Sequence, residues 1–309
     1  MTVASGEPLL LGAHVSTAGG TVTAPARAQA IGATVMQLFT KQANRWAERA
    51  CEGEECASFR TAVHAAGIAA AAAHDSYLIN LATPDETLRR RSVDSLVAEL
   101  RRCESLGLVY LVSHPGNHMA ADRASGIARN ADAITEALER ASGPTVLCLE
   151  TTAGSGTALG ATFEELAALI ERVGATQRPR VAVCVDTCHV YAAGYDLVND
   201  YEGVWARLAD AVGLDRLAVV HLNDSKTPFG SRRDRHELIG EGSLGEGPFR
   251  RIMNDERFAR VPKVIETPKL DDAERTDRRM LERLRGYVTN GAPREAPPHA
   301  DLPLAAPPG

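Results

Sequence analysis

The chain of 309 residues places histidine or carboxylate side chains at the ends of successive short apolar runs, at intervals of 35 to 45 residues. Imidazole nitrogens and carboxylate oxygens are the ligands that divalent transition metals take in proteins. One such residue at the end of a strand more often caps or hydrogen-bonds the backbone, but six at a regular interval favour a shared metal site. The six residues are His74, His114, Glu150, Asp186, His221 and Glu266, and His14 ends the first run in the same way.

Three further metal-type residues lie on loops. Asp186 and His189 form D-x-x-H, and Asp234 and His236 form D-x-H. Residues i and i+2 of an extended segment point to the same side, so the second pair can bind one ion together with His189. One metal takes roughly four to six protein ligands, so nine candidates predict two or three metals. Mixed nitrogen and oxygen donors fit Zn²⁺, and Mn²⁺ or Fe²⁺ are possible in part.

Basic residues share the stretch from His221 to His236 with these ligands. Cationic side chains repel a bare metal ion, so their presence there suggests a substrate that carries negative charge. A phosphodiester fits, because metals favour deprotonation of water and neutralise phosphate charge, while basic groups contact neighbouring phosphates without reading sequence. The alternative is a solvated loop. The basic residues are Lys226, Arg232, Arg233 and Arg235.

Eight apolar runs must position these side chains. They are rich in Val, Ile, Leu and Ala, which is typical of buried parallel strands, and helix-like segments separate them. This alternation predicts an α/β protein with a single (β/α)8 TIM barrel, whose strands all end at one face, where active sites lie. The runs cover residues 9–16, 34–40, 68–76, 108–116, 145–151, 180–187, 217–224 and 261–267.

Two segments show the helical pattern clearly. Residues 87–107 carry one apolar stripe, and residues 162–174 begin at a capping Thr162 and stop at Gly174. A doubly wound open sheet is the structural alternative. It usually has a G-x-G-x-x-G turn after its first strand, and the "STAGG" of residues 16–20 lacks that spacing.

Composition divides the chain into three parts. With 44% hydrophobic and 24% charged residues it is typical of a globular protein, and no apolar run is long enough to span a membrane. Residues 8–290 are expected to form the barrel, after an N-terminal extension of residues 1–7. Residues 291–309 hold six of the sixteen prolines and are expected to be a disordered tail.

Charge and cysteine content bear on partners and compartment. The net charge of −6 alone argues against nucleic acid, although bound metal ions would offset it. Six scattered cysteines indicate reduced thiols and a cytoplasmic protein, and Cys51 and Cys56 have no second pair with which to bind a metal. No basic residues precede the first apolar run, so we expect no signal peptide.

Several long motifs resemble the endonuclease IV family of metal-dependent apurinic/apyrimidinic endonucleases, which belong to the xylose-isomerase-like TIM barrels. The resemblance runs from "GAHVSTAGG" at residues 12–20 to "VIETP" at 264–268. It includes "QLFTK", "AHDSYLINLA", "SHPGNH", "ETTAGSGTALG", "VCVDTCHVYAAGYD" and "HLNDSKTPFGSRRDRHELIGEGSLG". It implies base-excision repair: hydrolysis of the phosphodiester 5′ to an abasic site, giving a 3′-hydroxyl and a 5′-deoxyribose phosphate.

The resemblance also implies a set of site residues and partners. Three Zn²⁺ would be bound by His74 and His114, by Asp186, His221 and Glu266, and by His189, Asp234 and His236. Glu150 would bridge the first two ions and orient or deprotonate the attacking water. The implied partner is double-stranded DNA with abasic sites or blocked 3′ ends, and we expect a monomer that contacts no membrane.

DNA contacts are implied on three loops. The "HDSYL" match gives Tyr77 and Leu78 the role of filling the gap at the damaged site, and their alternative is simple packing. Asn44 stands where the family has a wedge arginine, so Arg45 is the candidate for that role. Thr151 replaces the family's usual asparagine after the bridging glutamate. Phosphate contacts are expected from Lys226, Arg232 and Arg235.

Two other functions fit parts of this pattern. A sugar isomerase on the same barrel would hold one divalent metal with Glu150, Asp186, His221 and Glu266, leaving five candidate ligands without a role. A damage-binding module without catalysis would be expected to have lost some ligands, and none is missing. Metal stoichiometry distinguishes the isomerase, and cleavage of abasic DNA distinguishes the binding module.

Overall fold

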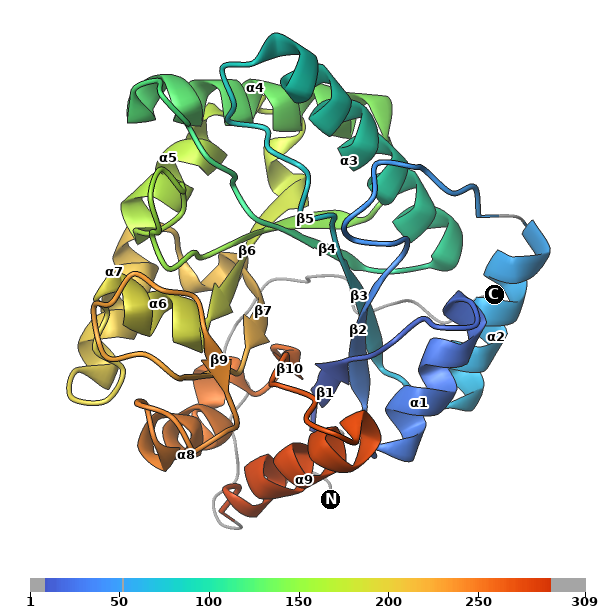
Figure 1. Cartoon of the computed structure of the whole chain (residues 1–309), viewed down its shortest axis with the longest axis vertical. Helices are drawn as coiled ribbons and strands as arrows, with labels where there is room; N and C mark the ends of the chain where they lie inside the picture. Colours follow the sequence, from blue (N-terminus) through green and yellow to red (C-terminus); the bar gives the residue numbers. More distant parts are fainter. Residues whose placement is uncertain (1–8, 52, 290–309) are drawn as a thin grey trace.

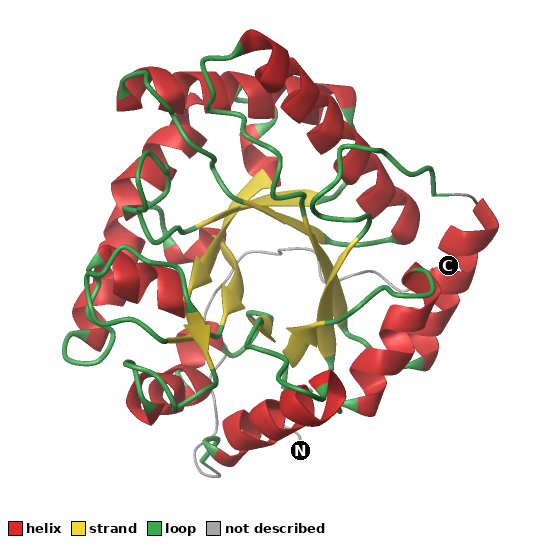
Figure 2. Cartoon of the chain, viewed as in Figure 1, coloured by secondary structure: helices red, strands yellow, loops and turns green. Residues whose placement is uncertain are grey.

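The computed structural model describes residues 9–51 and 53–289. The expected extension at 1–7 and the expected tail at 291–309 lie outside these residues. Parallel strands close into a barrel in the order β1-β10-β7-β6-β5-β4-β3-β2, and helices surround it (Figure 1, Figure 2). This confirms the prediction of a (β/α)8 TIM barrel and excludes the alternative, a doubly wound open sheet.

Each of the eight predicted apolar runs contains one barrel strand, so the strand predictions are confirmed. Adjacent strands pair in parallel, and strand β1 closes the ring by pairing with both β2 and β10. The strands are β1 (Leu11–His14), β2 (Val35–Phe39), β3 (Ala70–His74), β4 (Tyr110–Ser113), β5 (Val146–Glu150), β6 (Val181–Asp186), β7 (Leu217–His221) and β10 (Lys263–Ile265).

The helices cover the outer side of the barrel. Their bounds are α1 (Ala24–Ala30), α2 (Gly53–Ala65), α3 (Glu86–Leu106), α4 (Arg123–Arg140), α5 (Phe163–Arg172), α6 (Thr187–Ala193), α7 (Tyr201–Ala211), α8 (Glu246–Asn254) and α9 (Ala273–Gly286). As predicted, the Thr162 side chain caps α5 by accepting from the Glu165 amide. Helix α3 is capped by Asp85 and ends at Gly107, which has the left-handed φ of 74° that glycine tolerates best.

The barrel strands alternate in the direction of their side chains. One set faces the helices and forms the larger core, which includes Met36 and Leu38. The other set faces the barrel axis and forms a separate inner core. The inner core consists of Leu10, Val35, Ala70, Ala72, Tyr110, Val112, Val146, Cys148, Ala182, Cys184, Ala218, Val219 and Val264.

A short hairpin extends the barrel after β7. Strand β8 (Asp224–Ser225) pairs antiparallel with β9 (His236–Glu237), so Ser225 lies opposite His236. The buried Asp224 carboxylate accepts from the amides of Gly240, Gly242 and Leu244. These bonds anchor the segment after β9 and hold its start above the carboxyl end of the barrel.

The structure corrects one expectation about the cysteines. Cys51 and Cys56, expected to be reduced, are joined in a disulfide, because the loop before α2 brings their Cα atoms to 6.3 Å. The four other cysteines are free and buried. Among the described helices we find none with the length and apolar character needed to cross a membrane.

Candidate metal centre

Strand periodicity directs the six predicted strand-end residues toward the barrel axis. His74 follows Ala70 and Ala72 of the inner core at intervals of two residues, and Glu150 follows Val146 and Cys148. His114, Asp186 and Glu266 follow inner-core residues at the same interval. On β7, His221 follows Val219 by two residues, although Ala218 also belongs to the inner core, beside a register shift between β6 and β7. Glu150, Asp186 and His221 have no exposed surface. The inner core therefore ends, at the carboxyl side of the barrel, in a layer of imidazoles and carboxylates.

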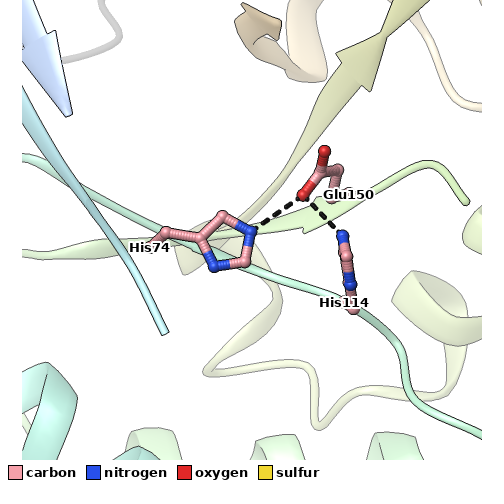
Figure 3. A group of neighbouring side chains, drawn as sticks. All are labelled: His74, His114 and Glu150. Carbon is pink, nitrogen blue, oxygen red and sulfur yellow. Dashed lines mark hydrogen bonds and ion pairs between the residues drawn. The ribbon is translucent and has the colours of Figure 1, made fainter. Parts of the chain in front are cut away.

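Glu150 lies at the centre of this layer. Its Oε2 is 3.0 Å from His74 Nε2 and 2.9 Å from His114 Nε2 (Figure 3). Its other oxygen, Oε1, is 3.0 Å from His221 Nδ1 and 3.4 Å from His189 Nδ1. Each carboxylate oxygen thus faces a different pair of imidazoles, which is the arrangement expected of a group that bridges two cations.

Three of the groups of potential ligands in the centre together contain the nine predicted residues. The first comprises His74, His114 and Glu150, and the ligand atoms within each group lie within 4.8 Å of one another. The second adds Asp186, His221 and Glu266 to Glu150, with His221 Nδ1 3.4 Å from Glu266 Oε2. The third comprises His189, Asp234 and His236.

The third group is assembled by α6 and the hairpin. Helix α6 begins directly after β6, and the Asp186 side chain caps it by accepting from the His189 amide. His236 reaches the same place from β9. Asp234 lies between the two rings, with Oδ2 3.2 Å from His189 Nε2 and Oδ1 3.3 Å from His236 Nε2.

The donor atoms of the third group fit a cation. The Nε2 atoms of His189 and His236 are buried and have no hydrogen-bond partner, although both lie near the Asp234 carboxylate. An unpaired buried polar atom costs about 1–3 kcal/mol, and an ion between these three groups would satisfy it. The nearby thiol of Cys188 competes poorly, because burial raises its pKa to about 12.

Electrostatics of the protein alone favour the charged forms of His74 and Glu150. Burial lowers the pKa of His74, but its hydrogen bond to Glu150 and the surrounding carboxylates raise the value to about 9. Burial raises the pKa of Glu150, but His114 and His221 lower it well below its usual range. A metal ion that binds here must displace protons from the imidazoles, so metal binding is expected to release protons.

Residues that the sequence did not single out hold these ligands in place. Gln37, in the middle of β2, contacts both His221 and Glu266. The Asn223 side chain donates to Asp186 Oδ2 and accepts from the Glu266 amide. A polar residue at an inward-facing position of an apolar strand is the signal that could have found Gln37. For Asn223, next to a ligand in a loop, we see no such signal.

Thr151 also supports two potential ligands. Its hydroxyl accepts from the Asp186 amide at 2.9 Å, and its carbonyl lies 2.8 Å from His189 Nδ1. If Nδ1 of His189 is protonated and donates a hydrogen bond to this carbonyl, Nε2 is unprotonated and its lone pair faces Asp234. The threonine therefore supports this arrangement although it replaces the asparagine expected from the resemblance.

The predicted DNA contacts lie on exposed loops around the centre. The Tyr77 side chain is 67% exposed, and its ring lies edge-on to Phe39 with a centroid distance of 5.4 Å. Leu78 is half-buried and Arg45 is exposed. Two hydrogen bonds tie the loops after β2 and β3 together: the Tyr77 amide and the Ser76 hydroxyl both donate to the Ala43 carbonyl. Also exposed are Lys226, Arg232, Arg233 and Arg235.

The chain is similar to one family of known proteins over most of its length. Residues 25–286 match the family model described as xylose isomerase-like TIM barrel. A probable endonuclease 4 of Chloroflexus aggregans is 45% identical over 280 residues, which cover 90% of this chain and 97% of the relative. One from Geobacter sulfurreducens is 48% identical over 267 residues, covering 85% and 90%.

Sequence identity to solved structures distinguishes one family from other proteins that share only the barrel fold. The crystal structure of endonuclease IV from Thermus thermophilus matches with a TM-score of 0.80 and 38% identity, covering 91% of this chain and 100% of that one. A D-tagatose 3-epimerase-like protein matches with a TM-score of 0.66 but only 16% identity, which shows the shared barrel fold alone.

Proposed function

The chain belongs to the endonuclease IV family, and from this premise we propose that it is an apurinic/apyrimidinic endonuclease of DNA base-excision repair. It hydrolyses the phosphodiester 5′ to an abasic site and leaves a 3′-hydroxyl and a 5′-deoxyribose phosphate. The observation that carries the proposal is the convergence of nine imidazole and carboxylate side chains into three neighbouring groups, two of which share Glu150. The identity to endonuclease 4 proteins favours this activity over sugar isomerisation.

The proposed cofactor is three Zn²⁺ per chain, with Mn²⁺ or Fe²⁺ possible in part. His74, His114 and Glu150 would hold the first ion, and Glu150, Asp186, His221 and Glu266 the second. His189, Asp234 and His236 would hold the third. When bound, the ions supply Lewis acidity, which favours deprotonation of the attacking water and neutralises charge that develops on the phosphate.

Glu150 is proposed as the catalytic residue. Its two oxygens face different imidazole pairs, which suits a carboxylate that bridges two ions. A carboxylate whose pKa is held low by its neighbours stays ionised and can orient the attacking water or accept its proton. Its complete burial keeps bulk water from screening these interactions.

The proposed substrate is double-stranded DNA with an abasic site or a blocked 3′ end. We call the loops after β2, β3 and β7 the recognition loops; they carry Arg45, Tyr77, Leu78, Lys226, Arg232 and Arg235. An abasic nucleotide has no base to unstack, so it is extruded more cheaply than an intact one, by on the order of a few kcal/mol. Tyr77 and Leu78 would fill the gap, and the basic side chains would contact phosphates. We expect the enzyme to act as a monomer.

Incision of a defined duplex tests the proposal. A labelled duplex with one synthetic abasic site should be cut once, 5′ to the site, and the product should carry a primer-competent 3′-hydroxyl. Prolonged treatment with a chelator should abolish cutting, and added Zn²⁺ should restore it. The matched duplex with an intact base should stay uncut. Binding of the abasic duplex without incision by metal-loaded protein would contradict the proposal and favour a damage-binding module.

A further inference from the structure

Gln37 is a buried polar residue inside the barrel. It lies in the middle of β2, among apolar neighbours, and has no exposed surface. Its side chain belongs to the inward-facing set, two residues after Val35 of the inner core. It lies beside His14 of β1 in the parallel pairing. An amide buried at this position must find partners inside the barrel.

Both ends of the Gln37 amide contact potential ligands of the second metal group. Its Oε1 lies 2.9 Å from His221 Nε2, and its Nε2 donates to Glu266 Oε1 at 2.6 Å. The opposite amide orientation would point Oε1 at the Glu266 carboxylate, where two acceptors repel. The carboxylate therefore fixes the orientation of the amide, and the amide oxygen can only accept a hydrogen bond from His221 Nε2.

This contact determines which nitrogen of His221 is available as a ligand. If His221 Nε2 is protonated and donates a hydrogen bond to Gln37 Oε1, then Nδ1 is unprotonated. The lone pair of Nδ1 then points toward Glu150 Oε1, 3.0 Å away. Backbone carbonyls lie in the equivalent place for three other imidazoles. The Asp75 carbonyl is 3.0 Å from His74 Nδ1, the Thr151 carbonyl is 2.8 Å from His189 Nδ1, and the Glu266 carbonyl is 3.3 Å from His236 Nδ1. For His221 a side chain from another strand does this.

We propose that Gln37 is a positioning residue for the second metal group, because it fixes the tautomer of His221 and the direction of the Glu266 carboxylate at once. The inference rests on the proposed function, since it requires the second ion. Gln37 touches neither metal nor substrate and acts through the two ligands. Substitution of a residue that hydrogen-bonds a metal ligand typically lowers metal affinity or activity by about 10- to 100-fold.

Metal affinity of two substituted proteins tests this role. Gln37→Met keeps the side-chain length and removes the contacts with His221, Glu266 and His14. Gln37→Glu keeps an acceptor for His221 but cannot donate to Glu266. In the zinc-loaded full chain, titration with a chromogenic chelator should show one zinc equivalent bound about 10- to 100-fold more weakly in either variant, with the other two unchanged. For abasic duplex, kcat should fall while KM stays near the wild-type value.

Met36→Ala is the matched control. Met36 is the preceding residue of β2, equally buried, but it faces the helices in the outer core. Its truncation should lower the melting temperature and leave all three zinc affinities unchanged. Unchanged zinc binding in both Gln37 variants, or equal weakening of all three equivalents as the melting temperature falls, would overturn the inference. Wild-type protein that binds no divalent metal would overturn the proposed function as well.

Discussion

The metal centre and the recognition loops share one face of the barrel but are built differently. Glu150 and His221 are the last residues of their strands and are completely buried. Tyr77 and Arg232, in contrast, lie on loops and expose their side chains. Side chains at strand ends are directed by the two-residue period of the sheet, whereas loop side chains are directed by local contacts and by a partner. We therefore expect the rate of incision to depend on the metal centre, and the affinity for abasic DNA to depend on the recognition loops.

The recognition loop after β2 is nevertheless anchored by a partly buried ionic network. Lys41 Nζ pairs with Glu48 Oε1 at 2.7 Å, and Arg102 of α3 pairs with Glu48 Oε2 at 2.6 Å and Glu99 Oε2 at 2.9 Å. These contacts hold both ends of the segment that carries Arg45. The loop thus has a fixed base and an exposed tip, which differs from the metal centre, where five of the nine side chains are buried and only Asp234 is exposed.

The largest effect should come from Glu150→Gln, which breaks the chemistry and leaves the recognition loops intact. The incision rate at saturating substrate should fall about 10²- to 10⁴-fold, because the amide neither bridges two cations nor accepts a proton. Affinity for abasic duplex should change much less. Single-turnover kinetics and a binding titration measure the two effects. Glu237→Gln, a half-exposed neighbour of His236, is the matched control and should retain activity. Activity of Glu150→Gln within a few-fold of wild type would refute the role of Glu150.

Removal of the loop anchor should act on stability. Arg102→Met leaves the buried Glu99 carboxylate without its ion pair, and loss of one partner of a buried pair costs about 3–5 kcal/mol. The free energy of unfolding, measured with denaturant, should fall by about this amount, while the zinc content stays the same. Arg101→Met, which removes an exposed arginine of the same helix, should have little effect. Equal stability of the two variants would show that the network does not anchor the loop.

A smaller effect separates damage recognition from general DNA binding. The double variant Tyr77→Ala and Leu78→Ala should weaken binding to abasic duplex by about 1–3 kcal/mol, the range for aromatic side chains that stack on bases. Binding to intact duplex should hardly change, because phosphate contacts dominate it. Competition binding at fixed salt measures both. Equal losses on the two duplexes would leave a packing role for these residues.

The smallest effect is expected for a single phosphate contact. Lys226→Ala should weaken binding to damaged and intact duplex alike, and the slope of log K against log salt should become shallower by about 0.9. Glu237→Ala on the same hairpin is the control for local disturbance. An unchanged salt slope would show that Lys226 is a solvated residue without a phosphate contact.

The sequence predicted the barrel and the convergence of the six strand-end side chains because both follow from chain periodicity. A strand-and-helix unit repeats, and residues at strand ends must meet at one face. The support around them was not predicted: Gln37 and Asn223 contact ligands from elements distant in sequence, and such contacts require coordinates. The disulfide between Cys51 and Cys56 was also missed, since it depends on how the loop before α2 folds back.

Elemental analysis of the metal-loaded protein tests the central claim most directly. Nine side chains form three neighbouring groups, with Glu150 shared between two of them. We therefore expect about three equivalents of divalent metal per chain, mostly zinc, after removal of loosely bound ions. The variant Asp234→Ala should lose one equivalent and keep the other two. A value near one in fully loaded wild-type protein would contradict the account, because one ion would leave the first and third groups without a function.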